Sequence, residues 1–97
     1  NRDAGHALAP RRIFAFVPLC GIALAAAILA AGPETIAAFI FEPVVGAAGG
    51  CVPSPGDYAR RVREICSRHG VLMIADEVMC GAGRSGPWRA LERDGVE

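Results

Sequence analysis

Two continuous runs of apolar residues interrupt an otherwise mixed pattern of hydrophobic and polar positions. The first run, Ile36 to Phe41, ends at Glu42-Pro43, and the second, Val71 to Ala75, ends at Asp76-Glu77. Short apolar runs that end in polar or turn-forming residues are typical of buried strands in a parallel sheet. The sequence therefore predicts two buried strands, the first covered on both faces, and each followed by a carboxylate.

The segment between these runs has helical periodicity. Its apolar positions recur at i, i+4, i+7 and i+8, and they are Tyr58, Val62, Ile65 and Cys66. Asp57 suits the positive end of a helix, and Gly70 suits the left-handed position that ends one. Strand, helix and strand in this order predict a βαβ unit with a right-handed connection and parallel strands. Both acidic strand ends should then lie at the same edge of the sheet, where open α/β sheets bind ligands.

Two further segments precede and interrupt this unit. Residues Gly21 to Ala31 are rich in alanine, with Leu24 and Ile28 one turn apart, and they predict a helix that Gly32-Pro33 ends. Residues Val44 to Gly56 are rich in glycine and proline, which predicts a loop. The glycines of this loop would let the backbone approach a ligand or another chain closely.

An uncharged run from Ile13 to Ala31 follows Arg11 and Arg12 and is just long enough to span a bilayer. Pro18 interrupts the run, and much of it is alanine and glycine, which favours a helix of a globular protein. Membrane association is therefore not favoured. The alternative that stays open is a noncatalytic remnant tethered to a membrane through residues 13–31.

Composition narrows the class of protein. The 97 residues, of which 53% are hydrophobic and 21% charged, fit one small piece of a globular protein and not a disordered chain. Ten basic and ten acidic residues cancel, so no overall field favours nucleic acid or an anionic membrane as a partner. All basic residues are arginine, so the chain offers no lysine amine for Schiff-base chemistry. The scattered cysteines indicate reduced thiols and a cytoplasmic location.

Two weak motifs suggest other kinds of binding site, one for a metal ion and one for a dinucleotide. Cys66 and His69 form a C-x-x-H half-site, but without a second pair of ligands we interpret it as a packed thiol and a helix-end histidine, and we predict no metal site. Gly81 to Gly86 matches G-x-G-x-x-G. Five residues separate it from the strand and Pro87 follows it, whereas a dinucleotide-binding loop begins at the strand and opens a helix.

Asp76 needs a compensating partner, because desolvating an unpaired charge at the end of a buried strand is unfavourable. The structural partners would be Arg84 or backbone amides. The functional partners would be a metal, a ribose hydroxyl or a protonated ring nitrogen. The pattern of residues alone leaves these alternatives open.

Longer stretches of the chain carry a family resemblance. They are Gly32 to Ile40, Glu42 to Gly50, Arg63 to Val71 and above all Ile74 to Gly86, with the string IADEVMCGAGRSG. In these stretches the chain resembles the class-III aminotransferases, which are fold-type-I enzymes that depend on pyridoxal 5'-phosphate. The resemblance implies an α/β fold, a helix and a βαβ unit of the large cofactor-binding domain. It also implies transfer of an amino group between an amino acid or amine and a keto acid.

The resemblance also implies roles for particular residues. Asp76 corresponds to the aspartate that pairs with the protonated pyridine nitrogen of the cofactor, and Val78 to an apolar residue packed on the ring. Glu42 corresponds to a glutamate near the cofactor that orients other groups. Met79 stands where many family members have glutamine. Ala47 stands where the ornithine and γ-aminobutyrate branches have glutamate, which indicates a branch closer to the amine:pyruvate enzymes.

The resemblance also implies how the chain is divided and what kind of protein it comes from. Residues 1–20 are left unplaced, and residues 21–97 are expected to be an internal fragment of the pyridoxal-phosphate-binding large domain. The family's covalently binding lysine is expected beyond Glu97, so we predict no catalytic residue in the chain and expect it to be inactive alone. The parent enzyme is expected to be a homodimer whose partners are a small amino donor and a keto-acid acceptor.

Overall fold

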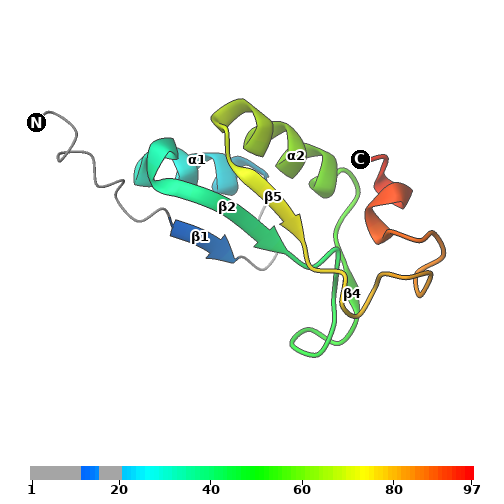
Figure 1. Ribbon diagram of the computed structural model, residues 1–97. Helices are drawn as coiled ribbons and strands as arrows, with labels where there is room; N and C mark the ends of the chain where they lie inside the picture. The colour runs from blue at the N-terminus through cyan, green and yellow to red at the C-terminus, as the bar shows by residue number, and fades with distance from the viewer. Residues whose placement is uncertain (1–11, 16–20) are drawn as a thin grey trace, which may run out of the picture.

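The computed structural model describes residues 12–15 and 21–97 (Figure 1). Along the chain, the strands and helices are β1 (Arg12–Ala15), α1 (Gly21–Ala31), the 3-10 helix η1 (Pro33–Thr35), β2 (Ile36–Phe41), β3 (Val44–Val45), β4 (Val52–Pro53), α2 (Tyr58–His69), β5 (Leu72–Ala75) and the 3-10 helix η2 (Ala90–Asp94). The predicted helices and the first predicted strand are confirmed with these bounds.

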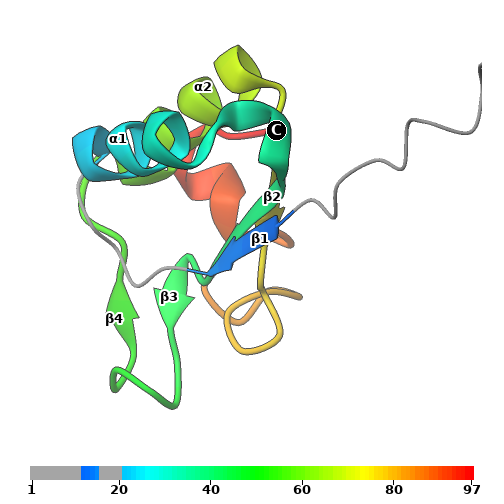
Figure 2. The same cartoon turned by 90° about the vertical axis from the view of Figure 1, so that its left-hand side faces the viewer.

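The main sheet contains β1, β2 and β5, in that order, and all its pairings are parallel. In the register of β2 and β5, Phe39 lies beside Met73 and Phe41 beside Ala75. Helices α1 and α2 lie together on one face of this sheet (Figures 1 and 2). The predicted α/β class, with a helix followed by a βαβ unit of parallel strands, is confirmed.

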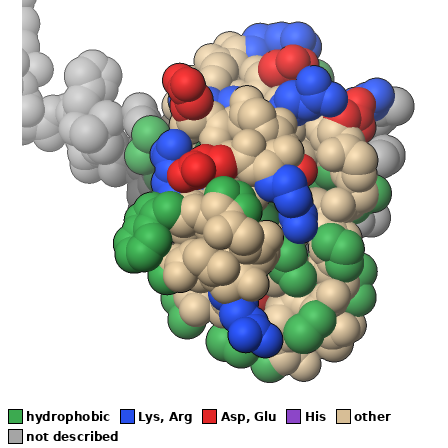
Figure 3. Space-filling view, turned by 90° about the vertical axis from the view of Figure 1, so that its right-hand side faces the viewer, with side chains coloured by type: hydrophobic (Ala, Val, Ile, Leu, Met, Phe, Trp, Pro, Cys, Tyr) green, Lys and Arg blue, Asp and Glu red, His purple; other side chains and the backbone are tan. Residues whose placement is uncertain are grey.

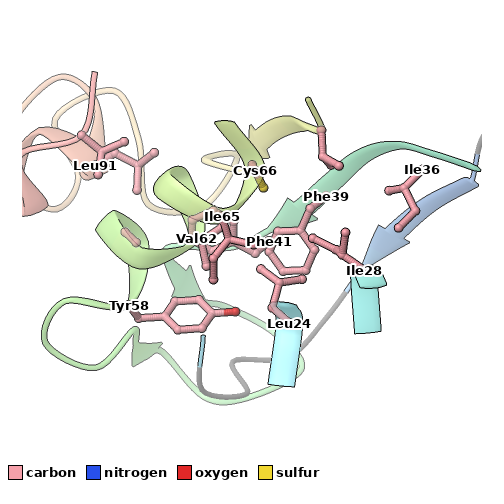
Figure 4. Close-up of a cluster of buried hydrophobic side chains, with 13 residues drawn as sticks. Leu24, Ile28, Ile36, Phe39, Phe41, Tyr58, Val62, Ile65, Cys66 and Leu91 are labelled. Atoms are coloured by element: carbon pink, nitrogen blue, oxygen red, sulfur yellow. The ribbon is translucent and has the colours of Figure 1, made fainter. Parts of the chain in front are cut away.

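The core fills the space between this sheet face and the two helices. Leu24 and Ile28 of α1 are 5% and 0% exposed, as the predicted buried stripe requires. The rings of Phe39 and Phe41 stack with centroids 5.8 Å apart, and Tyr58 meets Phe41 edge-on at the same centroid distance. Figure 4 shows the side chains of α1, α2 and β2 gathered in one cluster. Aromatic pairs of this geometry add to the stabilisation from burial.

The C-terminal end of α2 matches its sequence prediction, and the N-terminal end matches it only in part. Gly70 adopts φ 67°, the left-handed conformation predicted for it, and its N–H bonds to carbonyls of the last helical turn. Asp57 lies at the N-terminal boundary of the helix, but its carboxylate accepts no backbone N–H there. It accepts a hydrogen bond of 2.7 Å from Arg61 Nε instead.

The second predicted strand differs from its expectation. It begins at Leu72, and Leu72 and Ile74 are 68% and 41% exposed. Both helices lie on the other face of the sheet, where Met73 and Ala75 pack against the core. The second strand was expected to be buried, and this is wrong for the face that carries Leu72 and Ile74, because an apolar run by itself does not say how many faces are covered.

The expected loop from Val44 to Gly56 contains a small antiparallel pair that the sequence pattern did not predict. Strand β3 pairs with β4, with Val44 beside Pro53 and Val45 beside Val52. Each strand has only two residues, which is too short for a period-2 pattern to be visible. Glycine and proline composition therefore indicated a loop where the chain forms a short hairpin.

The apolar run from Ile13 to Ala31 is divided between different elements. Its first part belongs to β1, which pairs with β2 with Phe14 beside Phe39, and its last part is α1. Residues 1–11 and 16–20 lie outside the described residues, so the boundary drawn between 1–20 and 21–97 stays a prediction. Within the described residues, no helix combines the length and the apolar character needed to cross a bilayer.

Candidate functional site at the carboxyl edge of the sheet

Glu42 and Asp76 lie at the same edge of the sheet. Each follows the last residue of its strand, and these last residues, Phe41 and Ala75, are paired neighbours. The N–H of Asp76 donates a 2.8 Å hydrogen bond to the carbonyl of Phe41, which continues the ladder one step beyond the strands. The prediction that both carboxylates meet at one edge is confirmed.

The carboxylate of Asp76 has a backbone partner. Its Oδ1 accepts a 3.1 Å hydrogen bond from the N–H of Val78, two residues further along. Arg84 does not pair with it, since the ion pairs in the described part of the chain are Asp57–Arg61 and Arg89–Glu92. Of the structural partners considered for Asp76, a backbone amide is the one that bonds to it. Its Oδ2 has no hydrogen-bond partner among residues 12–15 and 21–97 and can accept another donor.

Glu42 is held by the turn that follows it. Its Oε2 accepts a 2.9 Å hydrogen bond from the N–H of Gly46. The carbonyl of Gly46 in turn accepts the N–H of Gly50 at 2.9 Å, which closes the tip of the hairpin. A Cβ atom at Gly46 would lie 3.1 Å from Cγ of Met79, so this turn touches the turn after β5. The two strand-end turns are therefore in direct contact.

The residues after Asp76 present apolar side chains to solvent. Val78 is 88% exposed and Met79 is 62% exposed. Exposed branched or flexible apolar side chains beside a carboxylate can cover the face of a flat ring whose edge the carboxylate binds. In Figure 3, most charged side chains, of both signs, lie in the upper part of this end of the molecule, and hydrophobic side chains surround a basic one in the lower part.

A cavity of about 600 Å³ lies between the hairpin turn and the turn after β5. Ala47 and Gly50 line it from the hairpin, and Met79 and Arg84 line it from the other turn. Its wall is largely apolar, with Arg84 as the cationic group. Asp76 and Glu42 are not part of its wall, so the cavity adjoins the carboxylate pair and does not contain it.

Glu77 has a role that its place in the sequence did not reveal. Its Oε2 accepts the N–H of Ala90 at 2.8 Å, and its Oε1 accepts the N–H of Leu91 at 3.2 Å. The acidic pair after the strand was visible in the sequence, but the partners are 13 and 14 residues away. The short helix η2 that supplies them had no recognisable signal.

Cys66 and His69 both lie on α2, and Cys66 is packed in the core as the sequence predicted. Cys66 is 0% exposed in the core, and burial raises the pKa of its thiol. The described part of the chain contains no cluster of three or more histidine, cysteine or acidic residues that could hold a metal ion. Residues 81 to 86 form turns and bends, and no helix begins after Gly86 before η2. The geometry of a dinucleotide-binding loop is therefore not formed.

The fold and the strand ends together define an α/β protein with a parallel sheet whose carboxyl edge carries a pair of acids. A sequence profile of the family described as aminotransferase class-III matches residues 17–97. The chain belongs to this family.

Named relatives agree with this assignment. The chain is 52% identical over 69 residues to a probable aminotransferase of Mycobacterium tuberculosis, a match that covers 71% of this chain and 15% of the relative. It is 52% identical to the 5-aminovalerate aminotransferase of Pseudomonas putida, over 68% of this chain and 15% of that protein. The chain thus spans about one seventh of the length of these relatives.

Solved structures show the same fold. An amine transaminase from an uncultivated Pseudomonas species, determined in its PLP-bound form, superposes with a TM-score of 0.75 and 51% identity, covering 79% of this chain and 17% of the other. A transaminase from the marine bacterium Virgibacillus gives a TM-score of 0.74 and 49% identity, with the same coverage. The arrangement of β2, α2 and β5 therefore belongs to the transaminase fold.

Proposed function

We propose that this chain is the part of a transaminase that holds the pyridine ring of pyridoxal 5'-phosphate, and that the protein moves an amino group between an amino acid or amine and a keto acid. The observation that carries the proposal is Asp76, a strand-end carboxylate in a family-matching segment, whose Oδ2 has no hydrogen-bond partner among the described residues. Family membership and the PLP-bound form of a similar transaminase support the choice of cofactor.

The residues of the strand ends fit the cofactor. Asp76 is partly exposed and pairs with no arginine in the described part of the chain, so its carboxylate can accept a hydrogen bond from a protonated ring nitrogen. Val78 is exposed beside it and can cover one face of the ring. Glu42 is fixed by the Gly46 N–H and can orient groups around the site. When bound, pyridoxal phosphate acts as the acceptor for electrons released at the substrate Cα.

The role of Asp76 is electrostatic. A carboxylate anion beside the pyridine nitrogen stabilises the protonated form of that nitrogen, because an opposite charge at hydrogen-bond distance favours the charged state. An asparagine in the same place would retain a hydrogen bond but would not stabilise the positive charge. The N–H of Val78 holds Oδ1 and so fixes the direction of the second oxygen.

The covalent step of the family requires an amine that this chain does not have, since all of its basic residues are arginine. We therefore propose that the chain acts within a longer protein and is inactive alone. A homodimeric parent and a cytoplasmic location belong to the same proposal. The location is supported by Cys51, Cys66 and Cys80, which are free thiols.

The substrate is proposed only as a class. Relatives of similar identity are named for different activities, including a γ-aminobutyrate transaminase of tomato and a hypotaurine/taurine–pyruvate aminotransferase of Paracoccus denitrificans. Ala47 lines the cavity beside the strand ends, where a glutamate of other branches would place a charge. We propose an apolar or amine-type donor with a keto-acid acceptor.

The test is the Asp76→Asn variant of the chain, with pyridoxal 5'-phosphate as the titrant and Trp88 fluorescence and cofactor absorbance as readouts. We expect the dissociation constant to rise about tenfold or more, as for loss of a charge-assisted hydrogen bond. Asp94→Asn, at the last residue of η2 and so at the opposite end of this helix from the Glu77 contacts, serves as the matched control. Equal affinity of the Asp76→Asn variant and the wild type would refute the role of Asp76.

A further inference from the structure

Glu77 connects two parts of the chain that the sequence separates widely. It follows Asp76 directly, and both of its carboxylate oxygens accept backbone N–H groups at the start of η2, from Ala90 and Leu91. Ala90 and Leu91 are themselves buried, and η2 packs against α2. The end of β5 is therefore fastened through Glu77 to an element anchored in the core.

The turn after β5 is built around the same side chain. The N–H of Gly81 donates a 2.8 Å hydrogen bond to the carbonyl of Glu77. A Cβ atom at Gly81 would lie 2.7 Å from that carbonyl oxygen and 2.9 Å from Oε2 of Glu77. The turn thus passes against the Glu77 carboxylate with no room for a side chain at its closest point.

The same turn contains the group that orients Asp76. Val78 donates its N–H to Asp76 Oδ1, and Val78 lies between Glu77 and Gly81. Its side chain is 88% exposed, so packing does not hold it in place. The position of the Val78 N–H therefore depends on the backbone of the turn, and the turn depends on Glu77.

We propose that Glu77 is a positioning residue for the cofactor site: by binding the Ala90 and Leu91 amides it fixes the turn that aims Asp76 and Val78. The inference rests on the proposed function, because it concerns the direction in which these residues meet pyridoxal phosphate. Glu77 itself touches no reacting atom in this role. Its two oxygens are already used by the backbone.

The test compares Glu77→Gln with wild type in the full 97-residue chain. Glutamine keeps the shape but has only one accepting oxygen, so one of the two amides loses its acceptor. We expect the ¹⁵N order parameter of the Val78 amide to fall from above about 0.8 to below about 0.6, while the amides of α2 stay rigid. The control Glu92→Gln changes a carboxylate that bonds the exposed Arg89 in the same region, and it should leave Val78 unaffected.

The cofactor supplies a second readout that does not depend on turnover. With ¹⁵N-labelled pyridoxal 5'-phosphate, the pyridine nitrogen signal of the bound cofactor should move toward its unprotonated position in Glu77→Gln, and the dissociation constant should rise about tenfold. A purely structural role would lower occupancy without moving the signal of the bound form. An unchanged signal together with a rigid Val78 amide would overturn the inference.

The experiments distinguish failure of the proposed cofactor binding from failure of the proposed role of Glu77. If the wild-type chain binds no pyridoxal phosphate, the proposed function of the chain fails, while the order parameter of Val78 still decides whether Glu77 fixes the turn. If Glu77→Gln loses α2 protection and unfolds, Glu77→Asp replaces it, because aspartate keeps the charge on a side chain one methylene shorter. A Val78 amide as rigid in Glu77→Asp as in wild type would then overturn the inference.

Discussion

At the scale of single residues, the turn after β5 shows how closely the backbone is specified. Gly81 has the carbonyl, Cβ and carboxylate of Glu77 within 2.9 Å of the place a Cβ atom would occupy. The next residue, Ala82, adopts φ 54°, a left-handed conformation that is unfavourable for a residue with a Cβ. Both neighbouring positions in this turn therefore favour glycine, although the second of them is occupied by alanine.

Gly81→Ala should destabilise the chain by about 1–3 kcal/mol, because the new methyl group has to displace backbone and not only a flexible side chain. Ala82→Gly, one residue further, should instead be neutral or stabilising by less than about 1 kcal/mol, since it relieves left-handed strain at some cost in chain entropy. Urea unfolding followed by circular dichroism measures both. The same sign for both variants would show that the described turn geometry is incorrect.

Cysteine reactivity tests burial at the same scale. Cys51 is exposed, whereas Cys66 is buried in the core, where burial raises the pKa of its thiol. Because the thiolate is the reactive form, iodoacetamide should alkylate Cys66 at least about tenfold more slowly than Cys51. Peptide mapping by mass spectrometry separates the two sites, and the rates should converge in denaturant. Equal rates in the native chain would contradict the packed position of Cys66.

At the scale of elements, the sequence predicted α1 and α2 from apolar positions that recur at helical spacing, and it predicted β2 from a continuous apolar run. Leu24 and Ile28 on α1, and Val62 with its neighbours on α2, are buried as their spacing required. Asp76 and Glu42 could be placed at one edge because parallel strands put their carboxyl ends together. Elements without a period, namely the β3–β4 hairpin and η2, could not be found in this way.

The role of Glu77 escaped prediction for a related reason. Its partners are backbone amides, which every residue has, and they belong to a short 3-10 helix 13 and 14 residues further along. Side-chain types in the sequence carry no information on such a contact. By contrast, Asp76 could be singled out, because a carboxylate after a buried strand requires compensation that can be anticipated.

Helix α2 offers a direct test of its two faces. Val62 is 0% exposed against the sheet, and Val62→Ala should lower the free energy of unfolding by about 1–3 kcal/mol through lost burial and a residual cavity. Arg63 is exposed to solvent on the same helix. Arg63→Ala should therefore change the free energy of unfolding by less than about 0.5 kcal/mol. Chemical denaturation compares the two variants. A larger effect at Arg63 would reverse the assignment of the buried face.

The start of α2 should also respond to pH. The hydrogen bond from Arg61 lowers the pKa of Asp57 below its ordinary value of 3.8, so the folded chain takes up this proton less readily than the unfolded chain. The resulting stabilisation is present above pH 3.8 and is lost as the pH falls through the lower folded-state pKa. Urea midpoints of wild type and Asp57→Asn should therefore differ at neutral pH and converge in acid. A gap that persists in acid would exclude this ion pair as its cause.

At the scale of the whole molecule, helices cover one sheet face, and the other face leaves apolar residues of β5 exposed. Helices α1 and α2 cover the face of Phe39 and Phe41, while Leu72 and Ile74 of β5 remain exposed on the other face. Exposed apolar residues on a strand favour contacts with other chains. The chain spans about one seventh of its relatives, so an open sheet face accords with a proposed place in a longer protein.

The open face predicts self-association of the 97-residue chain. Leu72→Lys should raise the dissociation constant of this association at least about tenfold, because it places a charge in the apolar row of β5. Leu29→Lys is the matched control, since Leu29 is similarly exposed, at 63%, but lies on α1. Sedimentation velocity over a range of concentrations measures both variants. An equal effect of the two substitutions would mean that association does not depend on the sheet face.

The strand order β1-β2-β5 follows the order of the chain, so each strand of the sheet is synthesised before the neighbour that pairs with it next. Among the described strands, none has to wait for a distant segment to be inserted between two others. Contacts between nearby parts of a chain form fast, and domains begin to fold while the ribosome is still at work. We expect this stretch to collapse early on a nascent polypeptide, with β1 and β5 at the two edges of its sheet.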